Sequence, residues 1–286
     1  MSKDFSKIPK SDIQLDIKVN RPSATSELQR TEEWQQQRKG CWTGSQKKAL
    51  MSCGRSGGRI SWLEPSKVFD FGDTALKYIY ENAMERKTGR YIDKGQGTTE
   101  IRYGTVVEPL IVKMLKKELK KQGSKLKYEP VGFKEYPNIN TAGVSADGVL
   151  NLKKVPYAVV EMKACTSWQT HYDRTFNFTD DKSIDFWQMQ SEMIAWGVKE
   201  CYYVVAEPPS DIRKYVYYDG NILDLYKDFK KEVSINIEVV KASEIHQKAL
   251  VHRVIIAEEV LNRFLTKGGD LKEVLYRTID EFKNNS

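Results

Sequence analysis

The chain has 286 residues, 40% of them hydrophobic and 30% charged, with a net charge of +7 and a pI near 9.0. This length allows one large domain or two small ones, and we favour one. No run approaches the ~20 consecutive apolar residues of a membrane span, and the opening residues MSKDFSKIPK lack the apolar core of a signal peptide. We therefore expect an intracellular, cytoplasmic protein without a membrane segment.

The net charge, the cysteines and the histidines bear on which partners and metal sites the chain can have. A basic chain suits a polyanionic partner such as nucleic acid, although many basic proteins bind none. The four cysteines contain no CxxC pair, and the three histidines are dispersed. Neither a disulfide framework nor a zinc site is indicated.

The first third of the chain reads as a polar arm followed by helices. Residues 1–28 show no sustained periodicity and predict an N-terminal arm. TEEWQQQRKG predicts a short helix, capped by Thr31 and stopped by Gly40. A second short helix is expected from Gly44-Ser45 to near Gly54, then the loop RSGGR, then helices at about 73–87 and 98–121.

The remainder alternates strands and helices, which is typical of an α/β protein. We expect a single domain over residues 29–286, with a helical extension from about 221. The segments expected to be strands are 128–136, 143–151, 157–163, 201–206 and one near 214–218, and a helix is expected at 183–196.

The helix at 98–121 carries one acid on its apolar face. On a helical wheel Glu108 lies close to Ile101, Gly104, Ile111, Val112 and Leu115, whereas the lysines lie on the far side. The basic run KMLKKELKKQGSKLK is interpreted as a solvated face. Glu108 is therefore either part of a buried site or half of a structural ion pair.

Glu161 and Lys163 are two apart in the strand YAVVEMKA, so they share one face of it, while Ala158, Val160 and Met162 take the other. Asp147, in GVSADGVL on the preceding strand, adds a second carboxylate. Two carboxylates and the Met162 carbonyl would suit Mg²⁺ or Mn²⁺, and Lys163 would bind phosphate, act as a base, or both. Alternatively, the ExK pair is an ordinary salt bridge and Asp147-Gly148 a turn.

The helix at 183–196 contains two glutamines that the wheel places on opposite sides. Gln190 is surrounded by apolar side chains and is predicted to face the core, whereas Gln188 points away. A buried amide should be hydrogen-bonded, and we expect Lys163 or a substrate phosphate to be its partner.

The ordered set of helix acid, strand Asp, ExK and helix Gln resembles the PD-(D/E)xK nuclease superfamily, and more narrowly the phage lambda-type exonucleases, also called YqaJ-like viral recombinases. The resemblance runs from about Trp34 to Pro209. The chain departs from the superfamily pattern at the residue before Asp147, where Ala146 replaces the Pro of the PD motif. The four blocks that carry it are EEWQQQRKGCWTGS, YGTVVEPLI, NTAGVSADGVL with VVEMKA, and DFWQMQSEMIAWGVKECYYVVAEP.

The resemblance implies a restriction-endonuclease-like core with a central mixed β-sheet flanked by helices, and a bacterial or phage-infected host cell. It implies that Asp147, Glu161 and the Met162 carbonyl bind Mg²⁺, with Mn²⁺ as a substitute. Lys163 would be the catalytic lysine, Glu108 would support the metal directly or through water, and Gln190 would position Lys163 or the nucleophile. It also implies a ring-shaped homotrimer and a single-strand annealing protein as partner.

The resemblance further places a grip for the 5′-terminal phosphate at Arg38, Ser45 and Ser145. Ser45 at a helix N-terminus suits a phosphate on physical grounds too, though it also suits a plain cap. Trp42 and Trp168 either stack on unpaired bases or pack.

The sequence thus predicts a Mg²⁺-dependent exodeoxyribonuclease that degrades one strand of duplex DNA from its 5′ end and leaves a 3′ single-stranded tail for recombination. The alternatives are an endonuclease of the same superfamily, of restriction or repair type, and a non-catalytic DNA-binding protein that retains the fold.

Overall fold

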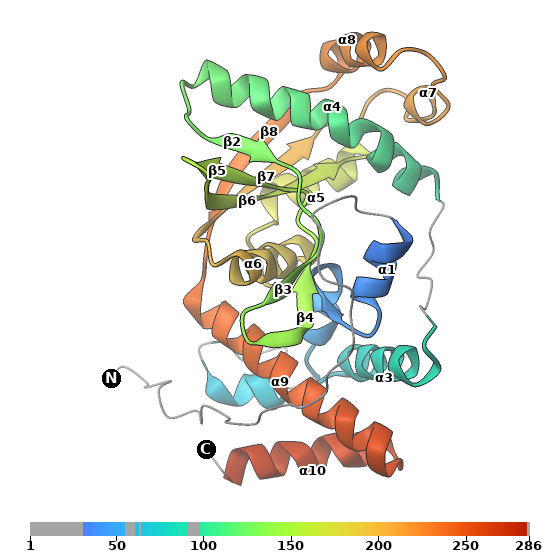
Figure 1. Cartoon of the computed structure of the whole chain (residues 1–286), viewed down its shortest axis with the longest axis vertical. Helices are drawn as coiled ribbons and strands as arrows, with labels where there is room; N and C mark the ends of the chain where they lie inside the picture. Colours follow the sequence, from blue (N-terminus) through green and yellow to red (C-terminus); the bar gives the residue numbers. More distant parts are fainter. Residues whose placement is uncertain (1–30, 55–60, 63, 91–97, 285–286) are drawn as a thin grey trace.

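A five-stranded mixed sheet crosses one half of the molecule (Figure 1). The computed structural model describes residues 31–54, 61–62, 64–90 and 98–284, so the predicted arm and the RSGGR loop lie outside the described residues. The strand order is β2-β5-β6-β7-β8, and only β6 and β7 run parallel. The strands are β2 (Lys127–Glu129), β5 (Gly148–Leu152), β6 (Val155–Ala164), β7 (Glu200–Ala206) and β8 (Ile235–Lys241).

Helices cover both faces of this sheet. The parallel β6–β7 pair needs a crossover connection, which α5 (Trp168–Phe176) and α6 (Ile184–Trp196) supply. α6 packs on one face, and α4 (Thr99–Lys121) lies across the other with α7 (Arg213–Val216) and α8 (Ile222–Glu232) beside it (Figure 1). The predicted central mixed sheet flanked by helices is confirmed.

The other half of the molecule combines the N-terminal and C-terminal helices around a second core. A three-stranded sheet of order β1-β4-β3 joins the two halves. Its strands are β1 (Trp42–Thr43), β3 (Lys134–Tyr136) and β4 (Ile139–Val144). The helical elements are α1 (Glu32–Arg38), η2 (Gly44–Gln46), α2 (Lys47–Leu50), η4 (Pro65–Phe69), α3 (Asp73–Thr88), α9 (Glu244–Lys267) and α10 (Leu271–Asn284).

Local signals placed the helix ends well. The Thr31 hydroxyl accepts the N–H of Trp34 at 3.2 Å, and the Ser183 hydroxyl accepts that of Asp185 at 3.2 Å. Gly197 ends α6 with a φ of 64°, which favours glycine. Among the described residues, none of the helices is long and apolar enough to cross a membrane.

Four predicted segments differ in the structure. The segments 128–136 and 143–151 each supply strands to two sheets, because the chain leaves the small sheet at Val144 and enters the large one at Gly148. Residues 213–216 form α7 rather than a strand, with Tyr215 buried against Tyr103 of α4. Residues 235–241, expected to be helical, form β8 along β7. Strand patterns do not reveal which strand will be the hydrogen-bonding neighbour.

Candidate active site

The predicted pairing of Glu161 and Lys163 on one face of β6 is confirmed. Met162 packs toward α4, while Glu161 points to the α6 side and is only 2% exposed. Because helices cover both faces, the ExK face is as enclosed as the apolar one. A carboxylate this deeply buried requires partners.

Asp147 lies where β5 begins, at the edge of β6. Its N–H donates to the Val160 carbonyl at 3.1 Å, and its Oδ2 accepts the Met162 N–H at 2.6 Å. The N–H and C=O of one strand residue point to the same neighbouring strand, so the Met162 carbonyl also points toward the Asp147 side. Asp147 and the backbone of Met162 thus lie side by side, and Glu161 is the residue before Met162 on β6.

Tyr128 of β2 fixes the backbone of Asp147. Its hydroxyl donates to the Asp147 carbonyl at 2.5 Å. The ring lies so close to Gly148 that a Cβ on this residue would collide with it. The glycine after Asp147 therefore permits a close approach, and the Asp147-Gly148 pair begins a strand rather than a turn.

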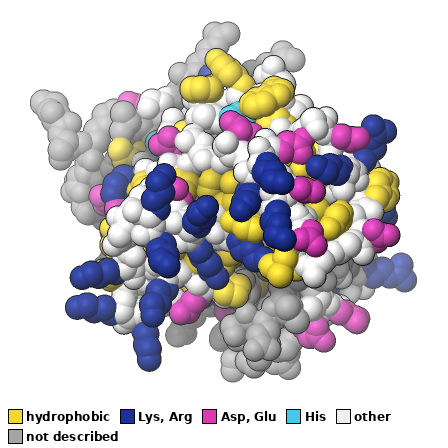
Figure 2. Space-filling model, turned by 90° about the horizontal axis from the view of Figure 1, so that it is seen from above, with side chains coloured by type: hydrophobic (Ala, Val, Ile, Leu, Met, Phe, Trp, Pro, Cys, Tyr) yellow, Lys and Arg dark blue, Asp and Glu magenta, His cyan; other side chains and the backbone are white. Residues whose placement is uncertain are grey.

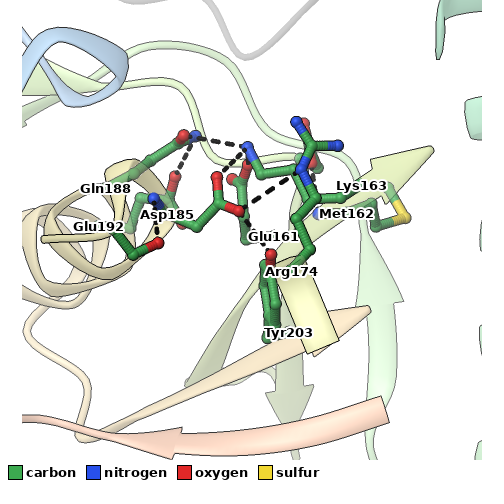
Figure 3. A network of polar contacts seen from close by, with 10 residues as sticks. Glu161, Met162, Lys163, Arg174, Asp185, Gln188, Glu192 and Tyr203 are labelled. Carbon is green, nitrogen blue, oxygen red and sulfur yellow. Dashed lines mark hydrogen bonds and ion pairs between the residues drawn. The ribbon is translucent and has the colours of Figure 1, made fainter. Parts of the chain in front are cut away.

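Lys163 is the centre of a polar network at the end of β6 (Figure 3). Its Nζ lies 2.5 Å from Glu161 Oε1, 3.2 Å from Asp185 Oδ1 and 3.1 Å from Gln188 Oε1. Burial alone would lower the pKa of Lys163, but Glu161 and Asp185 raise it above its ordinary value. The network therefore holds an ammonium in a fixed position.

The prediction for Gln190 is wrong in its partner. Gln190 is fully buried, as the wheel indicated, but it donates to the Lys241 carbonyl at 3.1 Å and accepts the N–H of Ser243 at 2.9 Å. It ties α6 to the junction of β8 and α9. Gln188, assigned to the outside, is the amide that contacts Lys163. A helical wheel gives only the direction of a side chain. Because α6 is covered on two sides, both Gln188 and Gln190 point to protein neighbours.

Asp185 and Tyr203 were missed by the sequence analysis. Asp185 Oδ2 accepts the Tyr203 hydroxyl at 2.6 Å and lies 3.6 Å from Arg174 Nε. Burial opposes ionisation of Asp185, but Lys163, Tyr203 and Arg174 hold the pKa of this carboxyl below its usual range. Asp185 thus supplies Lys163 with a second counter-charge, from α6.

Glu192 is a further buried acid on α6, where Gln188 Nε2 donates to its Oε1 at 3.1 Å. Burial and the carboxylate of Glu161 raise the pKa of Glu192 well above its usual range, which favours a neutral side chain. The signal that could have found this face is the spacing of Asp185, Gln188 and Glu192, at i, i+3 and i+7 of one helix.

Glu108 reaches the site from α4. It is half-buried. The pKa of Asp147 is raised well above its usual range by burial, then by Glu161 and by Glu108. The mutual repulsion of three carboxylates at one strand edge is the kind of field that a divalent cation relieves.

The three residues predicted to grip a 5′-phosphate are together, although they come from three separate segments. Arg38 Nη1 donates to Ser145 Oγ at 3.2 Å, and its Nη2 lies 3.5 Å from Ser45 Oγ. Trp34 Nε1 also donates to Ser145 Oγ at 2.9 Å, and its ring lies 4.1 Å from the Arg38 guanidinium carbon. We name Arg38, Ser45 and Ser145 the serine-arginine pocket.

Ser45 does not lie at the N-terminus of an α-helix, contrary to the expectation. Ser45 lies inside the short 3₁₀ turn η2, and the α-helix that follows has only four residues. This helix supplies little dipole, so Arg38 provides the charge of the pocket. Trp42 is buried, and its Nε1 donates a hydrogen bond to Glu258 Oε2 at 2.7 Å, so it packs in the core. Trp168, in contrast, is 64% exposed.

A cleft of about 680 Å³ connects the two groups. Lys163, Asp185 and Gln188 lie along it, as does Ser45. The remaining wall comes from α5 and the loop before α6, including Thr170, Asp173, Arg174, Asn177, Asp180 and Lys182. A single cleft therefore reaches Lys163 and Ser45, the latter one of the three residues of the serine-arginine pocket.

The described residues contain no group of three or more His, Cys, Asp or Glu side chains arranged around a metal position. The donor set nevertheless fits a hard cation at Asp147, Glu161 and the Met162 carbonyl. Glu161 Oε2 is buried without a hydrogen-bond partner among the described residues, and it is the atom such a cation would satisfy.

No protein-family model and no curated protein matches the sequence, but solved structures do. The alkaline exonuclease LHK-Exo from Laribacter hongkongensis, also solved in complex with dAMP, is 19% identical, with a TM-score of 0.55 over 89% of this chain and 100% of its own. A phage-related exonuclease from Haemophilus somnus is 15% identical, with a TM-score of 0.57 over 80% and 96%. At these identities the likeness establishes the fold alone: the chain shares the α/β architecture of these exonucleases, and the predicted restriction-endonuclease-like core is confirmed.

Proposed function

We propose that this chain is a divalent-metal-dependent exodeoxyribonuclease that uses Mg²⁺, with Mn²⁺ as a substitute, to degrade one strand of duplex DNA in the 5′ to 3′ direction. The observation that carries the proposal is the single cleft that joins Lys163 to Ser45, whose hydroxyl lies beside the Arg38 guanidinium that contacts Ser145. A pocket for a terminal phosphate beside a phosphodiesterase site implies cleavage one short step from a strand end. The 3′ tail that remains would serve recombination.

The similar exonucleases support the chemistry. All three solved structures are described as exonucleases, and LHK-Exo binds dAMP, a mononucleotide that carries a 5′-phosphate. For this chain we infer the same class of product, because the cleft volume of about 680 Å³ accommodates a nucleotide.

Asp147 and Glu161, with the Met162 carbonyl, would hold the cation, and Glu108 would support it directly or through water. When bound, the cation would lower the pKa of its water and neutralise charge on the phosphate. The ammonium of Lys163 binds a non-bridging oxygen of the scissile phosphate. Asp185 and Gln188 orient this ammonium, since both contact it and neither is a metal ligand in this scheme.

The serine-arginine pocket would give the reaction its polarity. The guanidinium of Arg38 and the two hydroxyls are suited to the dianionic terminal phosphate. Water replaces the 3′-oxygen on the scissile phosphorus, so each released nucleotide keeps its 5′-phosphate. The shortened strand then again presents a 5′-phosphate to the pocket.

The test is digestion of linear duplexes that carry a 5′-phosphate at one end only, with each strand labelled separately, with and without Mg²⁺. Loss of label from the phosphorylated strand, in single nucleotides and only with metal, is the expected result. Release from 3′ ends would refute the polarity. Failure to degrade any DNA in Mg²⁺ or Mn²⁺ would favour the non-catalytic alternative.

A closed circular duplex separates the exonuclease from the endonuclease alternative. The proposed enzyme leaves it intact, and linearisation or nicking would favour the restriction or repair type. The homotrimer and the annealing partner stay proposals based on resemblance. Light scattering of the purified chain tests the first, and co-purification with a single-strand annealing protein encoded beside it tests the second.

A further inference from the structure

The outer face of α4 carries a dense row of lysines. The stretch 113–127 contains seven lysines and one acid, Glu118. Five of these lysines recur along one side of the helix, opposite Glu108. Figure 2 shows many Lys and Arg side chains on the side of the molecule seen from above, where α4 lies. We name this set the α4 lysine face: Lys113, Lys116, Lys117, Lys120 and Lys121.

These charges are poorly compensated. Within the described ranges, the pair Lys121–Glu118, at 3.6 Å, is the only ion pair of the α4 lysine face. On the neighbouring α8, by contrast, Lys227 lies 2.8 Å from Asp224. Uncompensated like charges repel and need a reason to be kept close together, and a polyanion is the usual one.

The α4 lysine face is continuous with the candidate active site. Lys116 Nζ lies 5.0 Å from the centre of the Tyr128 ring, and the Tyr128 hydroxyl donates to the Asp147 carbonyl. A groove of about 440 Å³ runs between the end of α4 and β2, with Lys116, Lys120, Lys127 and Tyr128 in its walls. One end of this basic groove is therefore a single side chain away from a proposed metal ligand.

We propose that this groove, the α4–β2 groove, binds the sugar-phosphate backbone of the duplex that has not yet been degraded. The inference rests on the proposed function, because it assigns the surface that holds the substrate ahead of the cut. From Glu108 to Lys121 the helix extends 13 residues, or about 20 Å. That length matches about six base pairs at 3.4 Å each.

The chemistry of the groove fits a duplex rather than a single strand. Ammonium groups on a straight helix contact phosphates without reading bases. Duplex DNA is straight over this length because its persistence length is about 50 nm. Single strands are usually held by aromatic stacking, but the Tyr128 ring faces Lys116 and is not free to stack.

The experiment compares two triple variants that remove equal charge. The variant K116Q/K120Q/K127Q removes the three lysine charges that line the α4–β2 groove. The control K267Q/K272Q/K283Q removes three exposed lysines from the end of α9 and from α10, at the opposite end of the molecule (Figure 1). Binding of a 5′-phosphorylated 20-base-pair duplex is measured without divalent metal at several salt concentrations. The slope of log K against log salt is negative, and each lost phosphate contact makes it less negative by about 0.9.

We expect the slope of the groove variant to be less negative than that of the wild type by about two to three, with the control slope equal to that of the wild type. Cleavage at saturating DNA and low salt should stay within about threefold of the wild type for the control variant. Equal slopes for the groove variant and the wild type would overturn the proposal. So would an equal loss of affinity for a single strand of the same length.

The two proposals can fail separately. If the wild type cleaves no DNA, the nuclease assignment fails, whereas the salt slopes still decide whether the α4–β2 groove binds duplex. If the wild type cleaves from 5′ ends but the groove variant binds normally, only the groove assignment is lost.

Discussion

Lys163, whose side chain is 15% exposed, and the fully buried Lys47 have opposite surroundings. Lys163 lies between the carboxylates of Glu161 and Asp185, which raise its pKa. Lys47 is fully buried, donates to the Trp42 carbonyl at 2.8 Å and lies 4.7 Å from the centre of the Tyr136 ring. Burial lowers the pKa of Lys47 to about 7.

The difference shows what burial alone does to a lysine. Desolvation disfavours the ammonium at both sites, and only Lys163 has acidic partners that reverse the effect. A permanently charged lysine beside carboxylates suits phosphate chemistry, whereas Lys47 hydrogen-bonds a backbone carbonyl in a core position. We therefore assign function to the first and packing to the second.

Replacing each lysine gives the largest contrast. Lys163→Ala should lower the single-turnover cleavage rate by about 10²–10⁴-fold, because in the proposed mechanism it removes the ammonium that binds the scissile phosphate. Duplex binding without metal should survive and reports that the fold is intact. Lys47→Met should cleave DNA at close to the wild-type rate. Full activity of Lys163→Ala would refute the assignment.

Arg38 tests whether the site recognises a strand end. Arg38→Ala removes a charge-assisted hydrogen bond, worth about 1.5–3 kcal/mol, so kcat/KM on 5′-phosphorylated ends should fall about 10–100-fold. Unphosphorylated ends lack that charge and should be affected far less. An equal loss on both kinds of end would remove the end-anchor role from the serine-arginine pocket.

Gln188 and Gln190 form a matched pair on one helix. Gln188→Ala should lower the cleavage rate about tenfold, the effect of about 1.4 kcal/mol, because it frees Lys163 to move. Gln190→Ala should leave the rate per folded molecule unchanged and reduce the free energy of unfolding by about 1–3 kcal/mol, since it strands the N–H of Ser243. Cleavage kinetics and urea unfolding of both variants separate the two roles. A loss of cleavage rate in Gln190→Ala but not in Gln188→Ala would show that Gln190, as first predicted, positions Lys163.

Lys47 should make stability depend on pH. Its pKa is about 7 in the folded protein and 10.5 ordinarily, so between these values the unfolded chain binds the extra proton and stability rises with pH, by at most about 1.4 kcal/mol per unit. Below pH 7 the destabilisation by Lys47 is fully present.

The Lys47→Met variant lacks the amino group. Its free energy of unfolding should therefore exceed that of the wild type, by a margin that shrinks as pH rises from 7 to 10. Urea unfolding of both proteins at several pH values measures this, and other titrating groups cancel in the difference. Parallel curves would show that Lys47 is not held neutral.

The sequence predicted most where periodicity alone decides. A strand alternates its side chains, so Glu161 and Lys163 had to share a face, and the predicted cap at Thr31 located the helix that follows it. The sequence predicted less where a segment's neighbour decides its structure. A strand was expected near 214–218, but residues 213–216 form a helix whose Tyr215 contacts α4.

The sequence by itself determined which chemistry is present: two carboxylates and a lysine near one strand end, an acid on an apolar helix face, and an arginine with two serines. Tertiary structure decided which of these groups meet. It selected Gln188 over Gln190, added Asp185 to the environment of Lys163, and joined Arg38 to Ser145 from 107 residues away. The reason is physical: the direction of a side chain follows from local backbone geometry, whereas its neighbour depends on how sheets and helices pack.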